Sequence, residues 1–418
     1  MSFFRKGIVH TSFAVLRVFK VSKNSRSETS SFLFYLVCLV GVLALLSSTM
    51  AKNPTLSLFA SHLGVEDWQL GIIAAIGPIP GILLSFPAGA IADRWGKIRI
   101  IQLSLFFFAA APFLYLFVSE SWQLIPVRFF HGIATAIFGP IVLSLIVSYY
   151  PVNRASRMSF YSSLTMLGRV IAPALAGFLI TIGSFIAVYL TCAVSGIVAF
   201  SLGLTLPREK EFPGEEIVSS RIGSTDLKRL LTNRGIIITS TVEAMILFAS
   251  GAFETFLPVQ MEAFGWDPFT IGLVMALQIS VIILIKPVSG AFSDRWQRKP
   301  FVSLGLVVSA FSFIIFASFQ ENFAAYMLGA IFFGIGVALT TSSTAALVSD
   351  FSLDDEVASS IGMLSSIMDI GHSLGPFITG FLINFIGFFA AYFSVSVLLV
   401  LTVFVFLFLV VSPLKKAV

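Results

Sequence analysis

The 418-residue sequence is poor in the side chains that carry most of the chemistry of soluble proteins. It has two cysteines, Cys38 and Cys192, four histidines, and only 11% charged residues. Both cysteines lie inside apolar stretches, where a cysteine acts as a small packing residue, and no Cys/His spacing typical of a metal site occurs. There is also no nucleophile–base set and no phosphate-binding loop. We therefore expect a protein that is not an enzyme and that binds no metal or cofactor.

Apolar residues are abundant instead: they make up 57% of the chain, against about 45–50% in soluble domains. Stretches of roughly 18 or more apolar residues recur along its length, as expected of membrane-spanning helices. Only helices and closed barrels satisfy their backbone groups in lipid, and continuous runs favour helices. The sequence therefore predicts an all-α polytopic membrane protein with twelve spans, near 32–59, 66–92, 99–118, 122–149, 157–182, 184–206, 235–261, 268–293, 300–318, 322–349, 357–384 and 386–411.

The basic residues orient these spans. All but four of the 26 Lys and Arg residues fall on one face of the membrane if the spans alternate, and the exceptions, Lys52, Arg128, Arg169 and Lys286, lie inside spans. By the positive-inside rule this face is cytoplasmic and holds both termini. The opposite loops carry acids. We expect a multi-pass protein of the cell membrane, in contact with lipid; the net charge of +5 then needs no nucleic-acid partner.

The two halves of the chain repeat each other. A shift of 201 positions carries Gly71 onto Gly272 and Asp93 onto Asp294, and a shift of 203 carries the segment from Gly168 onto that from Gly371. Six spans return the chain to the same face, so the repeats are parallel. The predicted organisation is a cytoplasmic tail (1–30), a six-helix bundle (31–206), a cytoplasmic linker (207–234), a second bundle (235–411) and a short cytoplasmic tail (412–418).

One charged phrase occurs twice at equivalent places: GAIADRWGKIRI from Gly89, between spans 2 and 3, and GAFSDRWQRKP from Gly290, between spans 8 and 9. With twelve spans and a 6+6 repeat, this pattern resembles the major facilitator superfamily of secondary transporters, nearest to its proton-linked drug exporters. The resemblance extends from about residue 30 to 411. It implies two six-helix bundles, a small-molecule substrate, protons as the coupling ion, rocker-switch alternating access and a monomer.

The repeated phrase is a candidate cytoplasmic gate. The loop between spans 10 and 11 is acidic, and we expect it to form ion pairs with the first basic loop when the cytoplasmic side is closed. The second copy lacks one glycine, so we expect Asp93 to matter more than Asp294. The alternative is a charged anchor and tight turn. The candidate gating residues are Gly89, Asp93, Arg94, Gly96, Lys97, Arg99, Gly290, Asp294, Arg295, Asp354, Asp355 and Glu356.

Ionisable side chains inside spans are costly and are candidates for function. As proton-coupling residues we select Glu243, Glu254, Asp369 and Arg128. As substrate-binding residues we select Lys52, Arg169, Lys286 and His372. Each of these has an alternative reading as a buried structural partner. Small residues and prolines in spans 5 and 11 are candidate bends and close helix contacts: Gly168, Pro173, Gly177, Gly371, Gly375 and Pro376.

Three functions stay open at this point. The first is export of amphipathic compounds by proton antiport, which the resemblance favours. The second is transport of a small organic anion or metabolite, because the charges inside the spans of the first half, Lys52, Arg128 and Arg169, are all basic. The third is a sensor or assembly partner that does not transport.

Overall fold

The computed structural model describes residues 25–150, 154–206, 232–353 and 357–409, apart from the side chains of 25–31, 85–90, 93, 154–155 and 357–358. Within these ranges the chain is helical and has no strand. The helices are α2 (Ser25–Lys52), α3 (Thr55–His62), α4 (Asp67–Ile76), α5 (Ile79–Trp95), α6 (Lys97–Tyr115), η1 (Ser121–Gln123), α7 (Leu124–Tyr149), α8 (Arg154–Ile182), α9 (Phe185–Leu204), α11 (Arg234–Ala263), α12 (Pro268–Arg295), α13 (Arg298–Ser318), α14 (Phe323–Phe351) and α15 (Val357–Leu409).

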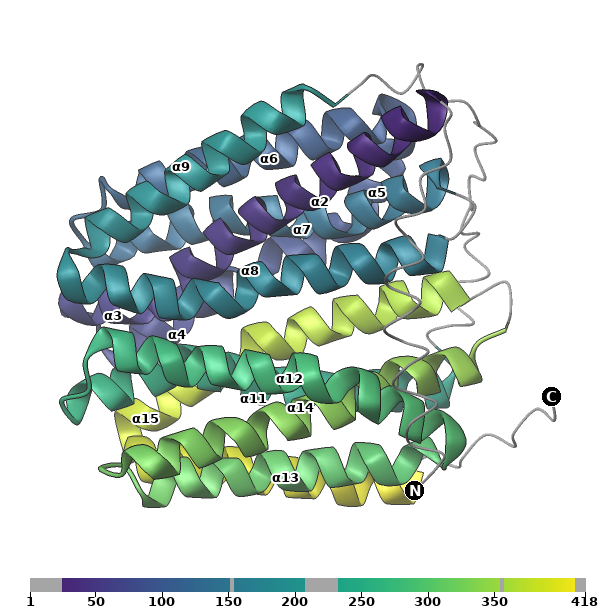
Figure 1. Cartoon of the computed structure of the whole chain (residues 1–418). Coiled ribbons are helices and arrows are strands. Elements are labelled where there is room, and N and C mark those ends of the chain that lie inside the picture. Colours follow the sequence, from purple (N-terminus) through teal and green to yellow (C-terminus); the bar gives the residue numbers. More distant parts are fainter. Residues whose placement is uncertain (1–24, 151–153, 207–231, 354–356, 410–418) are drawn as a thin grey trace, which may run out of the picture.

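The prediction of twelve membrane-spanning helices is confirmed. Eleven described stretches are long and apolar enough to cross a membrane, and the last of them contains two crossings. Gly387, with φ 76°, interrupts α15 there, and the two parts run antiparallel (Figure 1). Two other spans are built from two helices each. Span 1 is α2 with α3, broken at Pro54, and span 2 is α4 with α5, broken at Gly77 and Pro78, since proline removes a helical hydrogen bond.

The spans form two groups that follow the sequence repeat. In Figure 1 the helices from α2 to α9 make the upper group, and those from α11 to α15 make the lower group. We call them the first and second halves. The predicted tail 1–30 lies outside the described residues up to position 24, and the linker 207–234 lies outside them up to position 231.

The two ends of the bundle differ in charge. The basic end, at the right of Figure 1, carries Arg94, Arg99, Arg157, Arg295 and Arg298. At the opposite acidic end, carboxylates and amides begin the helices, where an anion and a capping oxygen are both favourable. Asp267 Oδ1, for example, accepts the amide protons of Phe269 and Thr270 at 3.0 and 3.1 Å. Hydrogen bonds from the Thr270 hydroxyl and these amides hold the pKa of Asp267 below its usual value.

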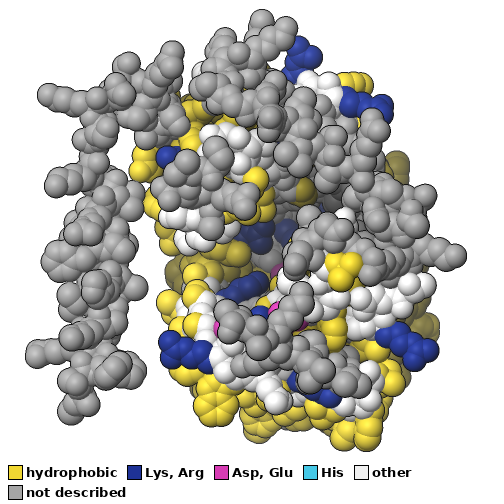
Figure 2. Space-filling model, turned by 90° about the vertical axis from the view of Figure 1, so that its right-hand side faces the viewer, with side chains coloured by type: hydrophobic (Ala, Val, Ile, Leu, Met, Phe, Trp, Pro, Cys, Tyr) yellow, Lys and Arg dark blue, Asp and Glu magenta, His cyan; other side chains and the backbone are white. Residues whose placement is uncertain are grey.

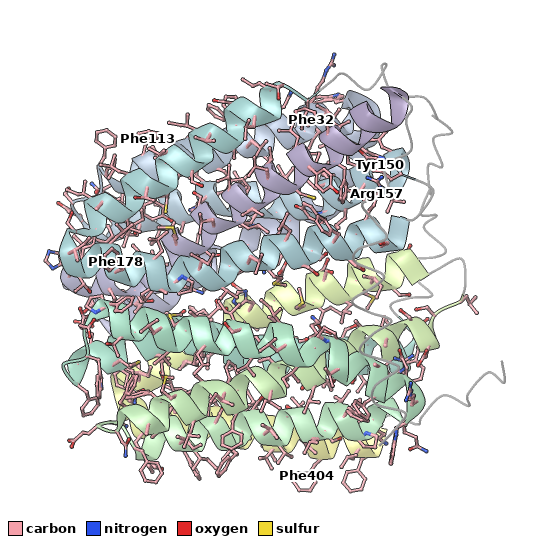
Figure 3. The ribbon with its side chains drawn as sticks, in the orientation of Figure 1. Phe32, Phe113, Tyr150, Arg157, Phe178 and Phe404 are labelled. Carbon is pink, nitrogen blue, oxygen red and sulfur yellow. The ribbon has the colours of Figure 1, made fainter. Side chains whose placement is uncertain are left out.

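The outer surface fits a lipid environment. Phe32, Phe113 and Phe404 point away from the bundle (Figure 3) and are 71%, 37% and 54% exposed. At the basic end, the Arg157 guanidinium stacks 4.1 Å from the ring centroid of Tyr150. An aromatic ring and a cation at such a position match the arrangement seen where spans leave the membrane.

Buried apolar residues divide the molecule along its length. At the acidic end one core contains residues of both halves, such as Leu56 of the first and Phe256 of the second, and it continues within the second half to Val302 and Phe406. At the basic end the first half has a separate core of its own, around Phe108 and Phe138. The second half has another there, around Ile236. The halves are therefore packed together at the acidic end and separate at the basic end.

Candidate functional site

The contact between the halves at the acidic end follows the two-fold repeat. Gly272 in α12 packs against the backbone of Pro173 in α8, and Gly71 in α4 packs against the carbonyl oxygen of Pro376 in α15. These pairs are repeat equivalents of each other. A second equivalent set lies nearer the surface, where Gly177 meets the backbone of Pro268 and Gly380 meets that of Asp67. We call these four contacts the seam. A β-carbon at any of the four glycines would meet backbone atoms that cannot move aside.

All six predicted bend residues thus lie in close helix contacts between or within the halves. Pro173, Gly177 and Pro376 belong to the seam. Gly371 and Gly375 pack on the backbone of Ala244 and Phe248 in α11. Gly168 makes the corresponding contact with Val42 in α2, where an added β-carbon would lie 2.9 Å from the carbonyl oxygen. Sequence reasoning did not select Gly71 and Gly272 as close-contact residues. Their match across the repeat could have indicated that both positions need a glycine.

Directly toward the basic end from the seam, a charged cluster joins the two halves. Lys52, the last residue of α2, donates from Nζ to Glu254 Oε2 of α11 at 2.5 Å. His372 Nε2 of α15 lies 3.3 Å from both atoms. We call these three residues the bridge. Each keeps between 20% and 27% of its side chain exposed, so the bridge borders water as well as protein. The sequence had placed Lys52, Glu254 and His372 in two separate roles.

Two more cations face the same interface. Arg169 of α8 and Lys286 of α12 are both exposed although they lie well inside their spans. Arg169 is close enough for its charge to act on Lys286 and Glu254 of the other half, so it faces that half and not lipid. Within the described part of the chain, neither cation makes an ion pair. Asp369 of α15 is half-buried nearby, within reach of the charge of Lys52.

The face at the basic end is hollowed between the halves (Figure 2). Figure 2 looks onto the basic end and shows Lys and Arg side chains in dark blue, and Asp and Glu in magenta, gathered inside it. We call this hollow the cavity. It is open toward the basic end and is closed toward the acidic end by the seam and the bridge.

Glu243 lies on α11 about three helical turns nearer the basic end than Glu254. Unlike the bridge, its hydrogen bond stays within the second half. Its side chain is 5% exposed, and the Thr344 hydroxyl of α14 is 2.5 Å from Glu243 Oε2. Lys286 is near enough for its charge to act on Glu243, but it forms no ion pair with it among the described residues. Thr344 was not among the candidate site residues selected from the sequence.

Arg128, selected as a proton-coupling residue, lies apart from the carboxylates. It is buried in α7 beneath the break between α4 and α5, with its guanidinium against Gly77. The neighbouring polar groups are Tyr115 and His131, whose Oη and Nδ1 are 3.5 Å apart. A cation at the end of a broken helix is stabilised by the unpaired carbonyl groups there. Among the described residues, Arg128 has no carboxylate partner, and its coupling role stays a prediction.

The expected gate at the basic end is described in part. Of the gating candidates, the side chains of Asp93, Asp354, Asp355 and Glu356 and residue Gly89 fall outside the described residues. Arg94 and Arg99 are exposed, and Lys97 Nζ donates to Ser148 of its own half at 2.5 Å. The predicted ion pairs between the halves involve acids that lie outside the described residues, so they stay a prediction.

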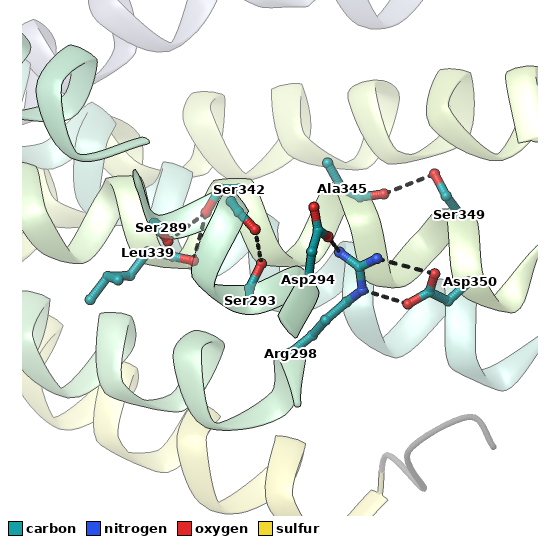
Figure 4. A network of polar contacts seen from close by, with 10 residues as sticks. Ser289, Ser293, Asp294, Arg298, Leu339, Ser342, Ala345, Ser349 and Asp350 are labelled. Atoms are coloured by element: carbon teal, nitrogen blue, oxygen red, sulfur yellow. Dashed lines mark hydrogen bonds and ion pairs between the residues drawn. The ribbon is translucent and has the colours of Figure 1, made fainter. Parts of the chain in front are cut away.

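The second half has an ion-pair network at this end that the sequence did not predict (Figure 4). Arg298 donates from Nε to Asp350 Oδ2 at 2.6 Å and pairs through Nη1 with Asp294 at 2.9 Å. Asp350, expected to face the first basic loop, therefore holds spans 8, 9 and 10 of its own half together. Arg298 is the repeat equivalent of Lys97, which was selected as a gating candidate. The repeat could therefore have indicated Arg298 as a further candidate at this end.

We expect Asp350→Asn to lower the free energy of unfolding by about 0.5–1 kcal/mol, because exposed ion pairs contribute little. Asp294→Asn should cost less, since Asp294 is 64% exposed against 38% for Asp350. Thermal unfolding in detergent at low and high salt measures both. A larger loss in Asp294→Asn would contradict this ranking.

Comparisons with known proteins agree with this architecture. The family model described as Major Facilitator Superfamily matches residues 37–260 and 239–418. The uncharacterized MFS-type transporter MJ1560 of Methanocaldococcus jannaschii is 21% identical over 352 residues, which cover 82% of this chain and 91% of that protein. The quinolone resistance protein NorA of Staphylococcus aureus is 28% identical over 138 residues, about a third of either chain.

Solved structures share the fold at low identity. A variant of the nucleoside transporter NupG superposes with a TM-score of 0.77 at 16% identity, covering 90% of this chain and 99% of NupG. A bacterial homologue of the human lysosomal transporter Spinster gives a TM-score of 0.71 at 18% identity, covering 91% and 95%. With twelve spans, a repeated six-helix unit and family matches in both halves, this chain belongs to the major facilitator superfamily and is a multi-pass membrane transporter of small molecules, not an enzyme.

Proposed function

We propose that this transporter moves a small organic anion, coupled to protons, by alternating access of the cavity to the two sides of the membrane. The observation that carries the proposal is the pair of cations Arg169 and Lys286. They come from different halves, they are exposed, and neither has an ion-pair partner among the described residues. A carboxylate or phosphate between them would relieve the repulsion of two like charges and receive charge-assisted hydrogen bonds.

Coupling to protons follows from the acids around these cations. With Lys52 and Glu254 neutralising each other, the cavity retains Arg169 and Lys286 against Glu243 and Asp369. Proton binding by either acid makes the cavity more positive and so strengthens anion binding, and by linkage the anion strengthens proton binding equally. The proposal also places the basic end in the cytoplasm of the cell, following the positive-inside rule, so the present conformation faces inward.

Export of amphipathic compounds by antiport is the second candidate. The partial match to NorA favours it, because NorA is named for quinolone resistance. A cavity with two free cations is a poor site for a cationic drug, which is why we rank the anion first. The two candidates differ in the charge of the substrate and can be separated in one assay.

The test uses purified protein in liposomes with an imposed pH gradient, assayed with labelled organic anions and with cationic dyes. We expect anion uptake, reduced about 10- to 100-fold in Arg169→Gln and in Lys286→Gln, because each removes a charge-assisted hydrogen bond of about 1.5–3 kcal/mol. Arg169→Lys should retain part of the flux. Arg234→Gln, which removes an exposed arginine at the start of α11, is the matched control.

Dye movement without anion movement would replace the first candidate by the second. Anion flux that is unchanged in both cation variants would remove Arg169 and Lys286 from the site.

A further inference from the structure

We propose that Glu243 is the carboxyl group that carries the coupling proton, and that the Thr344 hydroxyl is the positioning group that holds the proton there. This inference deepens the proposed function and rests on it for the claim that the proton is coupled to substrate movement. The sequence left Glu243, Glu254 and Asp369 as the candidate acids for proton coupling. The hydrogen bonds around Thr344 distinguish among them.

The first step is a count of hydrogens. Thr344 Oγ1 lies 2.9 Å from the carbonyl oxygen of Thr340, one turn earlier on α14, and 2.5 Å from Glu243 Oε2. A hydroxyl group has a single proton to donate, and a backbone carbonyl can only accept. Thr344 Oγ1 is placed to donate to either oxygen, but its single proton cannot serve both. The proposal assigns that proton to the carbonyl oxygen of Thr340, so the hydrogen between Thr344 and Glu243 belongs to the glutamic acid. The chain of hydrogen bonds then runs from Glu243 through Thr344 to Thr340, and the carboxyl group is protonated.

The surroundings of Glu243 also fit a neutral acid. An ionised carboxylate accepts up to four hydrogen bonds, and a buried one without a cation is costly. Yet the hydroxyl groups of Thr239 and Ser240, on the same helix, are buried and have no hydrogen-bond partner among the described residues. An ionised Glu243 would be expected to attract such donors. Among the described residues, no cation lies within ion-pair distance of it.

The two other acids are in different situations. Glu254 is bound to Lys52, so it is ionised and serves the bridge between the halves. Asp369 is half-buried and has no hydrogen bond within the described part of the chain. Among the three acids, Glu243 is thus the one whose carboxyl proton has an acceptor in place, the Thr344 hydroxyl oxygen. The elements packed against α11 carry the following charged and titratable groups: Lys286, Asp294 and Arg295 on α12, Asp369, His372 and Tyr392 on α15, Tyr326 and Asp350 on α14, and His62 and Asp67 on α3 and α4 at the acidic end.

In this proposal Glu243 binds the proton and does not bind the substrate, but it lies near Lys286, which does. Lys286 is close enough for the two charges to interact. Loss of the proton from Glu243 would create an anion that competes with the substrate for Lys286. Release of the proton would therefore promote release of the substrate anion, with no direct contact between Glu243 and the substrate.

The test is infrared difference spectroscopy of the full chain in lipid bilayers, between neutral and alkaline buffer. Wild-type protein should show the carbonyl stretch of a protonated carboxyl group that disappears at alkaline pH. We expect this band to be absent in Glu243→Gln. In Thr344→Val, which removes the hydroxyl and keeps the shape, the band should move to higher wavenumber. Thr344→Ser should restore it, and Ser343→Ala, at a buried hydroxyl next in the chain, should leave it unchanged.

A band that persists in Glu243→Gln, or that is lost in Glu254→Gln or Asp369→Asn instead, would overturn the assignment. The readout needs no substrate, so it is independent of the anion assay. If no anion moves but the band belongs to Glu243, the proposed function fails and the proton site stands. If anions move and the band belongs elsewhere, the proposed function stands and this inference fails.

Discussion

Replacement of Gly272 by leucine should hold the acidic end open and stop transport. The helices α8 and α12 touch through their backbones at this glycine, and an added side chain meets the carbonyl group of Pro173 and the α-carbon of Ala174. Overpacking of a close contact costs about 1–3 kcal/mol, so the ratio of closed to open seam should fall by up to about a hundredfold. Gly71, the repeat equivalent, should behave in the same way, because a β-carbon added there would lie 2.5 Å from the carbonyl oxygen of Pro376.

The measurement is the labelling rate of a cysteine placed beside the seam, between α4 and α15. Ser373 is suitable, because its hydroxyl is buried and donates to the carbonyl oxygen of Ala75 across the two halves. Ser373→Cys should react slowly with a maleimide in the parent protein and much faster with Gly272→Leu. Gly139→Leu is the matched control, since no atom lies within 4 Å of a β-carbon built there. Equal labelling in Gly272→Leu and in the control would contradict the role of the seam.

Removal of one charge from the bridge should have the second large effect. Glu254→Gln leaves Lys52 without its partner between the halves, and loss of one member of a buried pair costs about 3–5 kcal/mol. About a quarter of each side chain is exposed, so solvent reduces this to about 1–3 kcal/mol. Because the bridge joins the halves, we expect the loss to appear as easier opening of the acidic end. The Ser373→Cys labelling rate should rise about tenfold or more.

A double variant separates the pair from its members. Lys52→Met combined with Glu254→Gln removes both charges and should restore slow labelling, since no uncompensated charge then remains at the contact. Asp350→Asn, which breaks an ion pair inside one half, is the control and should leave the labelling rate unchanged. If the single and double variants label equally fast, the pair makes no joint contribution to closure.

The fold was largely predictable because each span carries its own signal. A helix in lipid satisfies its hydrogen bonds internally, so the apolar run alone defines it, and the basic loops count the crossings. The breaks inside spans were less predictable. Pro54 and Pro78 interrupt spans 1 and 2, while Pro112 and Pro140 lie inside continuous helices. Proline therefore marks where a break is allowed, and the neighbouring helices decide whether it occurs.

The candidate site was predicted as a set of residues and not as an arrangement. Every Lys, Arg, Asp and Glu well inside a span had been selected, because charge in a membrane is costly. His131 of span 4 had not. Their pairing was not predictable. Lys52 and Glu254 are 202 positions apart, and only the packing of the halves brings Nζ and Oε2 together. The same applies to Arg298, which binds Asp350 of its own half and not a group across the interface.

The sequence by itself determined what depends on each segment alone: twelve helical spans, their alternation, the doubled unit and the inventory of buried charges. These follow from local hydropathy and from the positions of Lys and Arg. Only the tertiary structure decided which charges neutralise each other and which have no ion-pair partner among the described residues. It also decided which glycines close the seam and which end of the cavity is open. Those properties depend on distances between helices far apart in the chain, and no local pattern contains them.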